Sequence, residues 1–221
     1  MKSAKPSFKP LLSILFSAFI VLSLSAHEAL AAAKISPLSE TDRETVARVE
    51  AYLNDLVTMK SRFLQASSTG NYTEGTFYLN RPGKMRIEYD PPVKFLIVAD
   101  GTWLMYLDKE LDQLTHLPLG STPADILVQE NISLLSGDIT VSKVEHAPGV
   151  VGVTLMREDE ESGRLTLIFA DKPLELKKWI VVDPQGVKTS VSLLSTQRDL
   201  SFDPGLFRLK LRPAKTPDVQ K

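Results

Sequence analysis

Residues 75–101 (GTFYLNRPGKMRIEYDPPVKFLIVADG) constrain the fold more than any other part of this 221-residue chain. Apolar and polar residues alternate on both sides of the Arg-Pro-Gly corner at 81–83, which predicts two half-buried strands joined by a turn. The Asp-Pro-Pro run at 90–92 ends the second strand, because proline has no amide to donate to a neighbouring strand. Residues 95–99 then run apolar into Asp100-Gly101, a dipeptide that favours a tight hairpin. The pattern predicts a sheet in which each strand pairs with the next one along the chain.

The rest of the chain continues this pattern and adds only two helices. About eleven short strands are predicted, separated by turn residues. Thr41, with Glu44 three residues later, indicates the start of a helix that has an apolar face between 46 and 56. Thr122 followed by Pro123 predicts a second, short helix. These elements predict a mainly β (α+β) fold, either a strongly curved, incomplete antiparallel β-barrel or a packed sandwich.

The first 31 residues have the pattern of an export signal. Lys2, Lys5 and Lys9 precede an apolar run over 11–24, and the small residues of the Ala-Leu-Ala triplet at 29–31 suit a signal peptidase. The apolar run has 14 residues, whereas a membrane span needs about 20, so we expect cleavage rather than anchoring. The expected organisation is a signal peptide over 1–31, a flexible lead-in over 32–38, a single domain over 39–212 and a polar tail over 213–221.

Composition argues against several classes of protein. The net charge is −1 and no basic stripe is present, which argues against a nucleic-acid partner. Cysteine is absent, so the exported chain has neither disulfides nor a lipidated cysteine, and we expect a soluble protein held together by packing. His116 and His146 have no partner at metal-ligand spacing, and no nucleophile, phosphate-loop or dinucleotide motif occurs. We therefore expect no enzyme activity, no metal and no cofactor.

Three segments in a fixed order carry a family resemblance. They are RPGxxRxEYxxP with the following ADG inside 75–101, STPADIL at 121–127, and DPGLFRL at 203–209. In these segments and their order the chain resembles the LolA family of periplasmic lipoprotein carriers, in which the second segment is a short lid helix and the third is the last strand. The resemblance covers nearly all of the expected mature chain. It implies an open half-barrel of antiparallel strands, with a helical lid over an apolar cavity.

The same resemblance implies a function. The chain is expected to be a monomeric periplasmic carrier that binds the acyl chains of outer-membrane lipoproteins. It would receive its cargo from an ATP-driven lipoprotein exporter in the inner membrane and deliver it to an outer-membrane lipoprotein receptor. Two alternatives of the same fold remain, a carrier of another envelope lipid and a lipid-sensing regulator that binds an anti-sigma factor.

The resemblance also implies roles for individual residues. In the family, the arginine of the Arg-Pro motif, here Arg81, holds the lid closed through hydrogen bonds to main-chain groups. Met85 falls at the mouth of the cavity, where methionine replaces an aromatic residue common in the family. From the residues alone, the stripe formed by Trp103, Met105 and Leu107 favours core over ligand contact. The residues expected to line the cavity are Ile87, Tyr89, Phe95, Ile97, Trp103 and Met105, with Ile126 and Leu127 lining the lid.

Overall fold

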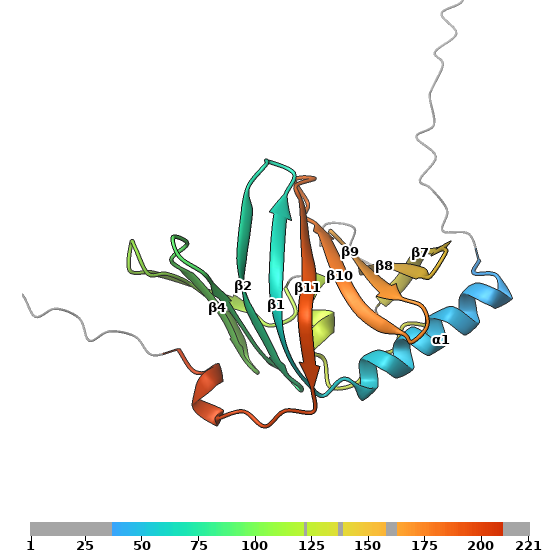
Figure 1. Ribbon diagram of the computed structural model, residues 1–221, viewed down its shortest axis with the longest axis horizontal. Helices are drawn as coiled ribbons and strands as arrows, with labels where there is room; N and C mark the ends of the chain where they lie inside the picture. The colour runs from blue at the N-terminus through green and yellow to red at the C-terminus, as the bar shows by residue number, and fades with distance from the viewer. Residues whose placement is uncertain (1–36, 122, 137–138, 158–162, 210–221) are drawn as a thin grey trace, which may run out of the picture. The chain divides into compact units, whose positions relative to one another are not determined.

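One antiparallel sheet of eleven strands makes up most of the described part of the chain (Figure 1). This computed structural model describes residues 37–121, 123–136, 139–157 and 163–209. The expected signal peptide and polar tail lie outside these residues. Within the described ranges, no helix has both the length and the apolar composition to cross a membrane.

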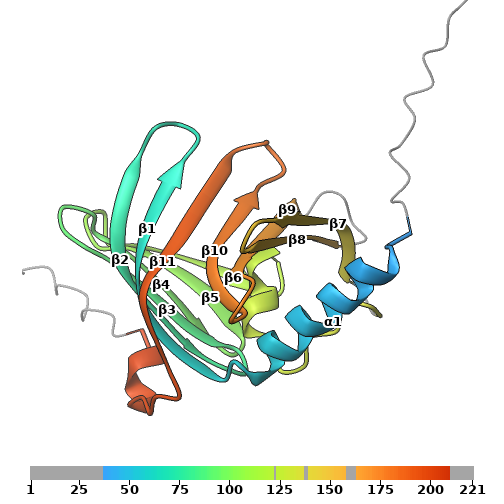
Figure 2. The same ribbon diagram turned by 45° about the vertical axis from the view of Figure 1, so that its right-hand side comes forward.

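The strands follow the chain in two meanders, β1 to β6 and β7 to β11. Pairing of β11 with β1 joins the two meanders, so β6 and β7 are the edges of the sheet. The sheet curves strongly without closing (Figure 2), which confirms the predicted incomplete antiparallel barrel. The strands are β1 (Thr58–Ser67), β2 (Tyr72–Asn80), β3 (Lys84–Tyr89), β4 (Phe95–Asp100), β5 (Trp103–Asp108), β6 (Gln113–Pro118), β7 (Ile139–Ala147), β8 (Val150–Arg157), β9 (Arg164–Ala170), β10 (Glu175–Val182) and β11 (Lys188–Arg198).

The main hydrophobic core lies on the inner face of the sheet, which we define as the face covered by the helices. Successive side chains of a strand point to opposite faces, so every second residue shares this face. On β2 these are Phe77 and Leu79, and on β9 they are Leu165 and Leu167, all at most 1% exposed. The alternation therefore puts one continuous apolar surface on the concave side of the sheet.

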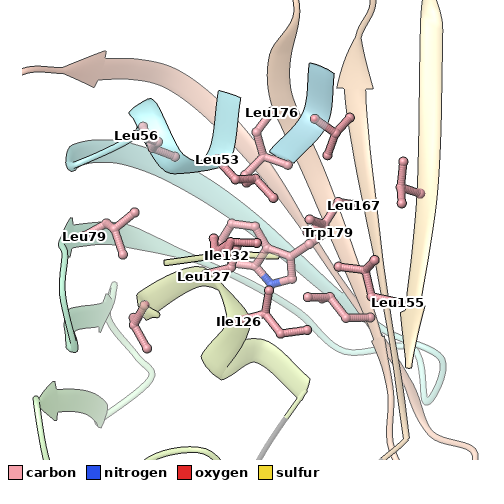
Figure 3. Close-up of a cluster of buried hydrophobic side chains, with 14 of the residues drawn as sticks. Leu53, Leu56, Leu79, Ile126, Leu127, Ile132, Leu155, Leu167, Leu176 and Trp179 are labelled. Carbon is pink, nitrogen blue, oxygen red and sulfur yellow. The ribbon is translucent and has the colours of Figure 1, made fainter. Parts of the chain in front are cut away.

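Helix α1 (Glu40–Asp55) and the 3-10 helix η1 (Pro123–Val128) cover the inner face. Helix α1 begins two residues earlier than the Thr41 cap predicts. The cap is Ser39, because its hydroxyl accepts a hydrogen bond from the main-chain N–H of Asp42 at 3.1 Å. Figure 3 shows Leu53 from α1, Leu56 directly after it, and Ile126 and Leu127 from η1, gathered with strand side chains around Trp179.

A second, smaller apolar cluster lies on the outer face of β4 and β5. It is covered from the C-terminal side by the 3-10 helix η3 (Pro204–Phe207) and Leu209. The predicted last strand is wrong in its described part, residues 207–209. Asp203 caps a helical turn there instead, and its Oδ1 accepts from the N–H of Gly205 at 2.6 Å. The cluster consists of Leu96, Val98, Met105 and Leu107, with Leu114 and Leu209 packed against it.

Candidate functional site

Arg81, in the turn between β2 and β3, is a buried cation whose side-chain hydrogen bonds all go to main-chain carbonyls. Only 8% of the residue is exposed. The guanidinium donates to the carbonyl oxygens of Leu53 and, at 3.3 Å, Leu56, both at the C-terminal end of α1. It also donates to the carbonyl oxygens of Gln129 at 2.7 Å and Glu130 at 3.1 Å, just after η1. One side chain therefore ties the sheet to both parts of its cover, which we call the lid (α1 together with residues 123–134).

The position of Arg81 suits a cation. The C-terminal carbonyls of a helix carry partial negative charge, and α1 has no basic residue of its own in its last turn. Arg81 supplies that charge from another element. Burial lowers the pKa of Arg81 below its ordinary value, but a guanidinium remains protonated at neutral pH. Within the described residues no carboxylate pairs with it, so the carbonyls carry the whole interaction.

Gly83 explains why the turn after Arg81 needs glycine. Its φ is +75°, a left-handed conformation that other residues adopt at a cost. A Cβ atom at Gly83 would also lie 2.7 Å from the Cα atom of Gly101, in the neighbouring turn between β4 and β5. The N–H of Gly83 donates to the carbonyl oxygen of Val128 at 2.7 Å. The Arg-Pro-Gly corner therefore contacts the lid through its main chain as well as through Arg81.

The two parts of the lid are also joined to each other. The side-chain amide of Asn54 donates to the carbonyl of Ile132 at 2.8 Å, and its oxygen accepts from the N–H of the same residue at 2.9 Å. Glu50 Oε2 accepts from the N–H of Leu134 at 2.7 Å. Asn54 and Glu50 were not predicted as site residues, because side-chain bonds to a distant main chain leave no pattern in a sequence.

The structure places most of the expected lining residues on the inner face. Met85 is buried there at 5% exposure, and Ile126 and Leu127 of the lid are buried at 1% and 4%. Phe95 lies on the same face of β4 as Ile97, but it is 49% exposed at the start of the strand. That these residues bind a ligand stays a prediction. The inner-face set that is half-buried against the core consists of Ile87, Tyr89 and Ile97.

Trp103 and Met105 are a correction to the expected lining. Met105 lies in the outer-face cluster, and Trp103, two residues earlier, shares that face and contacts the His116 ring at 6.2 Å. The inner-face residues of β5 are instead Leu104 and Tyr106, which pack against the main core. Since 103–107 is apolar throughout, its alternation has no polar member to mark the outer face. The register with β4, which sets Ile97 opposite Tyr106, would have identified the correct set.

Comparison with known proteins gives one consistent family. The profile of the family described as "Outer membrane lipoprotein carrier protein LolA" matches residues 54–210. An outer-membrane lipoprotein carrier protein from Methylococcus capsulatus is 27% identical over 77% of this chain and 85% of its own length. One from Alkalilimnicola ehrlichii is 29% identical over 84% and 87%. A crystal structure of a LolA superfamily protein from Nitrosomonas europaea aligns with a TM-score of 0.45 at 8% identity, over 74% of this chain and 97% of that one.

Proposed function

Because the chain belongs to the LolA family of outer membrane lipoprotein carrier proteins, we propose that it carries lipoproteins across the periplasm. In this proposal it binds the acyl chains of lipoproteins released from the inner membrane by an ATP-driven exporter, and it delivers them to a receptor in the outer membrane. The acyl chains lie against the inner face of the sheet, beneath the lid.

The observation that supports this proposal is the buried Arg81. Its four hydrogen bonds hold the lid over an apolar surface. A hydrogen bond from a charged donor contributes about 1.5–3 kcal/mol, which is enough to keep a lid closed and small enough to be replaced by ligand contacts. An arginine that served only the fold would more often pair with a carboxylate or lie in water. Four main-chain acceptors on two separate segments fit a reversible closure.

The physical chemistry of the cargo explains why a lidded apolar surface suits it. Exposing acyl chains to water costs about 0.8 kcal/mol for each methylene, so a lipoprotein crosses an aqueous compartment only with its chains covered. A carrier that recognises acyl surface alone serves many cargo proteins. It must also release them to the receptor, which a lid held by exchangeable hydrogen bonds permits.

The test is Arg81→Leu in the full-length protein, expressed in a Gram-negative host and purified from its periplasm. We expect the variant to fold and to retain acylated lipoproteins that the wild type releases. Without Arg81, the closed state loses its hydrogen bonds to the lid and no longer competes with the open, cargo-bound state. Bound molecules are identified by mass spectrometry. The matched control is Arg86→Leu on β3, an arginine that donates to the carbonyl of Leu206 at 2.9 Å on the outer face. This control should release cargo like the wild type.

Two results would overturn the proposal. One is recovery of Arg81→Leu without any acylated molecule, together with a wild type that binds none. The other is an Arg81→Leu variant that carries only free phospholipid or glycolipid, which would show that the protein carries another envelope lipid. Retention of lipoproteins by Arg86→Leu as strongly as by Arg81→Leu would show that the latch is not the cause.

A further inference from the structure

A group of polar side chains lies on the inner face at the end of the strands opposite Arg81. Gln65 on β1 is directly across from Thr73 on β2, and Gly75 on β2 is across from Tyr89 on β3. The Tyr89 ring meets the ring of Phe63 edge-on at 5.5 Å, and its hydroxyl donates to Gln65 Oε1 at 2.9 Å. Three neighbouring strands thus bring an amide and two hydroxyls to one end of an otherwise apolar surface.

Two members of this group have hydrogen-bonding atoms that the described residues leave unused. The hydroxyl oxygen of Thr73 is buried and has no hydrogen-bond partner among the described residues. Since Tyr89 already donates to the Gln65 oxygen, the Gln65 NH₂ remains as a donor, and it makes no other bond in the described part of the chain. A buried polar group without a partner is rare in proteins and requires an explanation, such as a ligand. A ligand with hydrogen-bond acceptors would satisfy both the Gln65 NH₂ and the Thr73 hydroxyl, which can each donate.

Tyr106 extends the group to β5. It shares the inner face with Ile97, its partner across the strands, and its hydroxyl makes no hydrogen bond within the described residues. Burial raises the pKa of both Tyr89 and Tyr106, so both hydroxyls keep their protons at neutral pH and can donate. Tyr106 also lies close enough to Tyr89 to contribute to that shift.

The acceptor is an uncharged one. Inner-face positions of β1 to β5 hold no lysine or arginine in the described ranges. The arginines of these strands, Arg62 and Arg86, point to the outer face, where they pair with Asp90 and Glu88. A carboxylate or phosphate would have no cation beside it and would lose its hydration. A neutral carbonyl oxygen attached to an alkyl chain meets both the donors and the apolar surface next to them.

We propose that Gln65, Thr73, Tyr89 and Tyr106 form a polar subsite that binds the ester carbonyls of the acyl chains carried on the inner face. This inference rests on the proposed carrier function and adds the orientation of the cargo. The ester end of the lipid lies at the end of the strands opposite Arg81, where residues 68–71 join β1 to β2. The alkyl chains run along Ile87 and Ile97 towards Arg81 and the lid.

The test compares two phosphatidylcholines with the same headgroup and chain length, one with ester and one with ether linkages. The ether lipid lacks only the carbonyl acceptors. Displacement of a fluorescent fatty-acid probe from the full-length wild type should favour the ester lipid by roughly two- to tenfold, the range that a net hydrogen bond provides. Thr73→Val and Tyr106→Phe should each reduce this preference, and Tyr78→Phe should leave it unchanged. Tyr78 is the matched control because it lies on the outer face, against Phe202.

The outcomes separate the subsite from the carrier function. Equal affinity of the wild type for both lipids, with displacement of the probe by each, would overturn the subsite and leave the proposed function intact. Failure of the probe and both lipids to bind the wild type and Arg81→Leu would overturn both. Thermal melts check each variant, and Thr73→Val, which changes side-chain volume least, keeps the test valid if a tyrosine variant does not fold.

Discussion

The two halves of the inner face differ in how completely they are covered. On β8 and β9, the inner-face residues Val153, Leu155, Leu165 and Leu167 are all 0% exposed. On β3 to β5, the inner-face residues farther from Arg81 are only half-buried, and Phe95 is 49% exposed, whereas Met85, Ala99 and Leu104 are at most 5% exposed. The β8–β9 half is therefore closed core throughout, and the part of β3 to β5 farther from Arg81 is apolar surface that a ligand can still cover. The half-buried residues are Ile87, Tyr89, Ile97 and Tyr106.

The hydrogen bonds of the lid show the same asymmetry. Four residues along α1 bond to the β7–β11 half, and the pairs are Asp42 with His146, Arg48 with Asp171, Tyr52 with the N–H of Leu176, and Asp55 with Arg198. From the β1–β6 half, the described side-chain bonds to the lid all come from Arg81, with one main-chain bond from Gly83. If the lid opens, it should open by separating from the β1–β6 half.

The largest expected effect would test the contrast in packing. Leu167→Ala should lower the free energy of unfolding by about 2–5 kcal/mol, because it leaves a cavity in a fully closed region. Ile97→Ala should cost clearly less, since part of this side chain already contacts solvent, but it should weaken acyl-ligand binding more than Leu167→Ala does. Urea denaturation and probe displacement measure the two quantities. Equal losses of stability in the two variants would remove the distinction between core and binding surface.

A middle-sized effect concerns the lid itself. Asn54→Ala removes both hydrogen bonds to Ile132 and leaves its main-chain N–H and carbonyl without these partners. We expect the free energy of local unfolding of the lid to fall by about 1–3 kcal/mol, with no change in the rest of the sheet. Hydrogen exchange should become faster at residues 131–134 and stay unchanged on β8 and β9. Asn71→Ala is the control, because this residue lies in an exposed hairpin and its side-chain amide donates to the Thr69 hydroxyl at 3.3 Å. Faster exchange throughout the sheet would show that the lid is part of the global folding unit.

The smallest expected effect depends on pH. The Arg48 guanidinium, 2.6 Å from Asp171, holds the pKa of that carboxyl below its ordinary value of 3.8. A carboxyl whose pKa falls on folding stabilises the folded state above its unfolded pKa, and this stabilisation is lost as pH falls through the folded pKa. Asp171→Asn should therefore be less stable than the wild type at pH 7, and the two should converge below about pH 3.8. Denaturation curves across this range measure the difference, and a gap that persisted in acid would contradict the ion pair as its cause.

The sheet could be predicted from the sequence more fully than the site. Alternation around the Arg-Pro-Gly corner predicted β2 and β3, and turn residues predicted the strands on either side, because these are local signals. Arg81 became a candidate through its position in a family motif, since an arginine beside Pro-Gly is otherwise an ordinary turn residue. Its burial depends on carbonyls that lie 25 and more positions away in the chain.

The failures have physical causes. Trp103 and Met105 were assigned to the wrong face because both faces of β5 are apolar and each contributes to a hydrophobic cluster, one on the inner face and one on the outer face. A strand that packs against apolar residues on both sides lacks the polar residues that reveal its orientation. The Asn54 contact joins residues 78 positions apart, and nothing in either segment alone predicts it.

Since Arg81 bonds only to peptide carbonyls in the lid, the latch does not depend on which amino acids the lid contains. Substitutions at positions 53, 56, 129 and 130 leave the acceptors in place as long as the backbone keeps its path, whereas an apolar residue in place of Arg81 removes all the donors. The latch itself therefore puts no demand on the side chains of the four acceptor residues, and selection on these hydrogen bonds falls on a single codon.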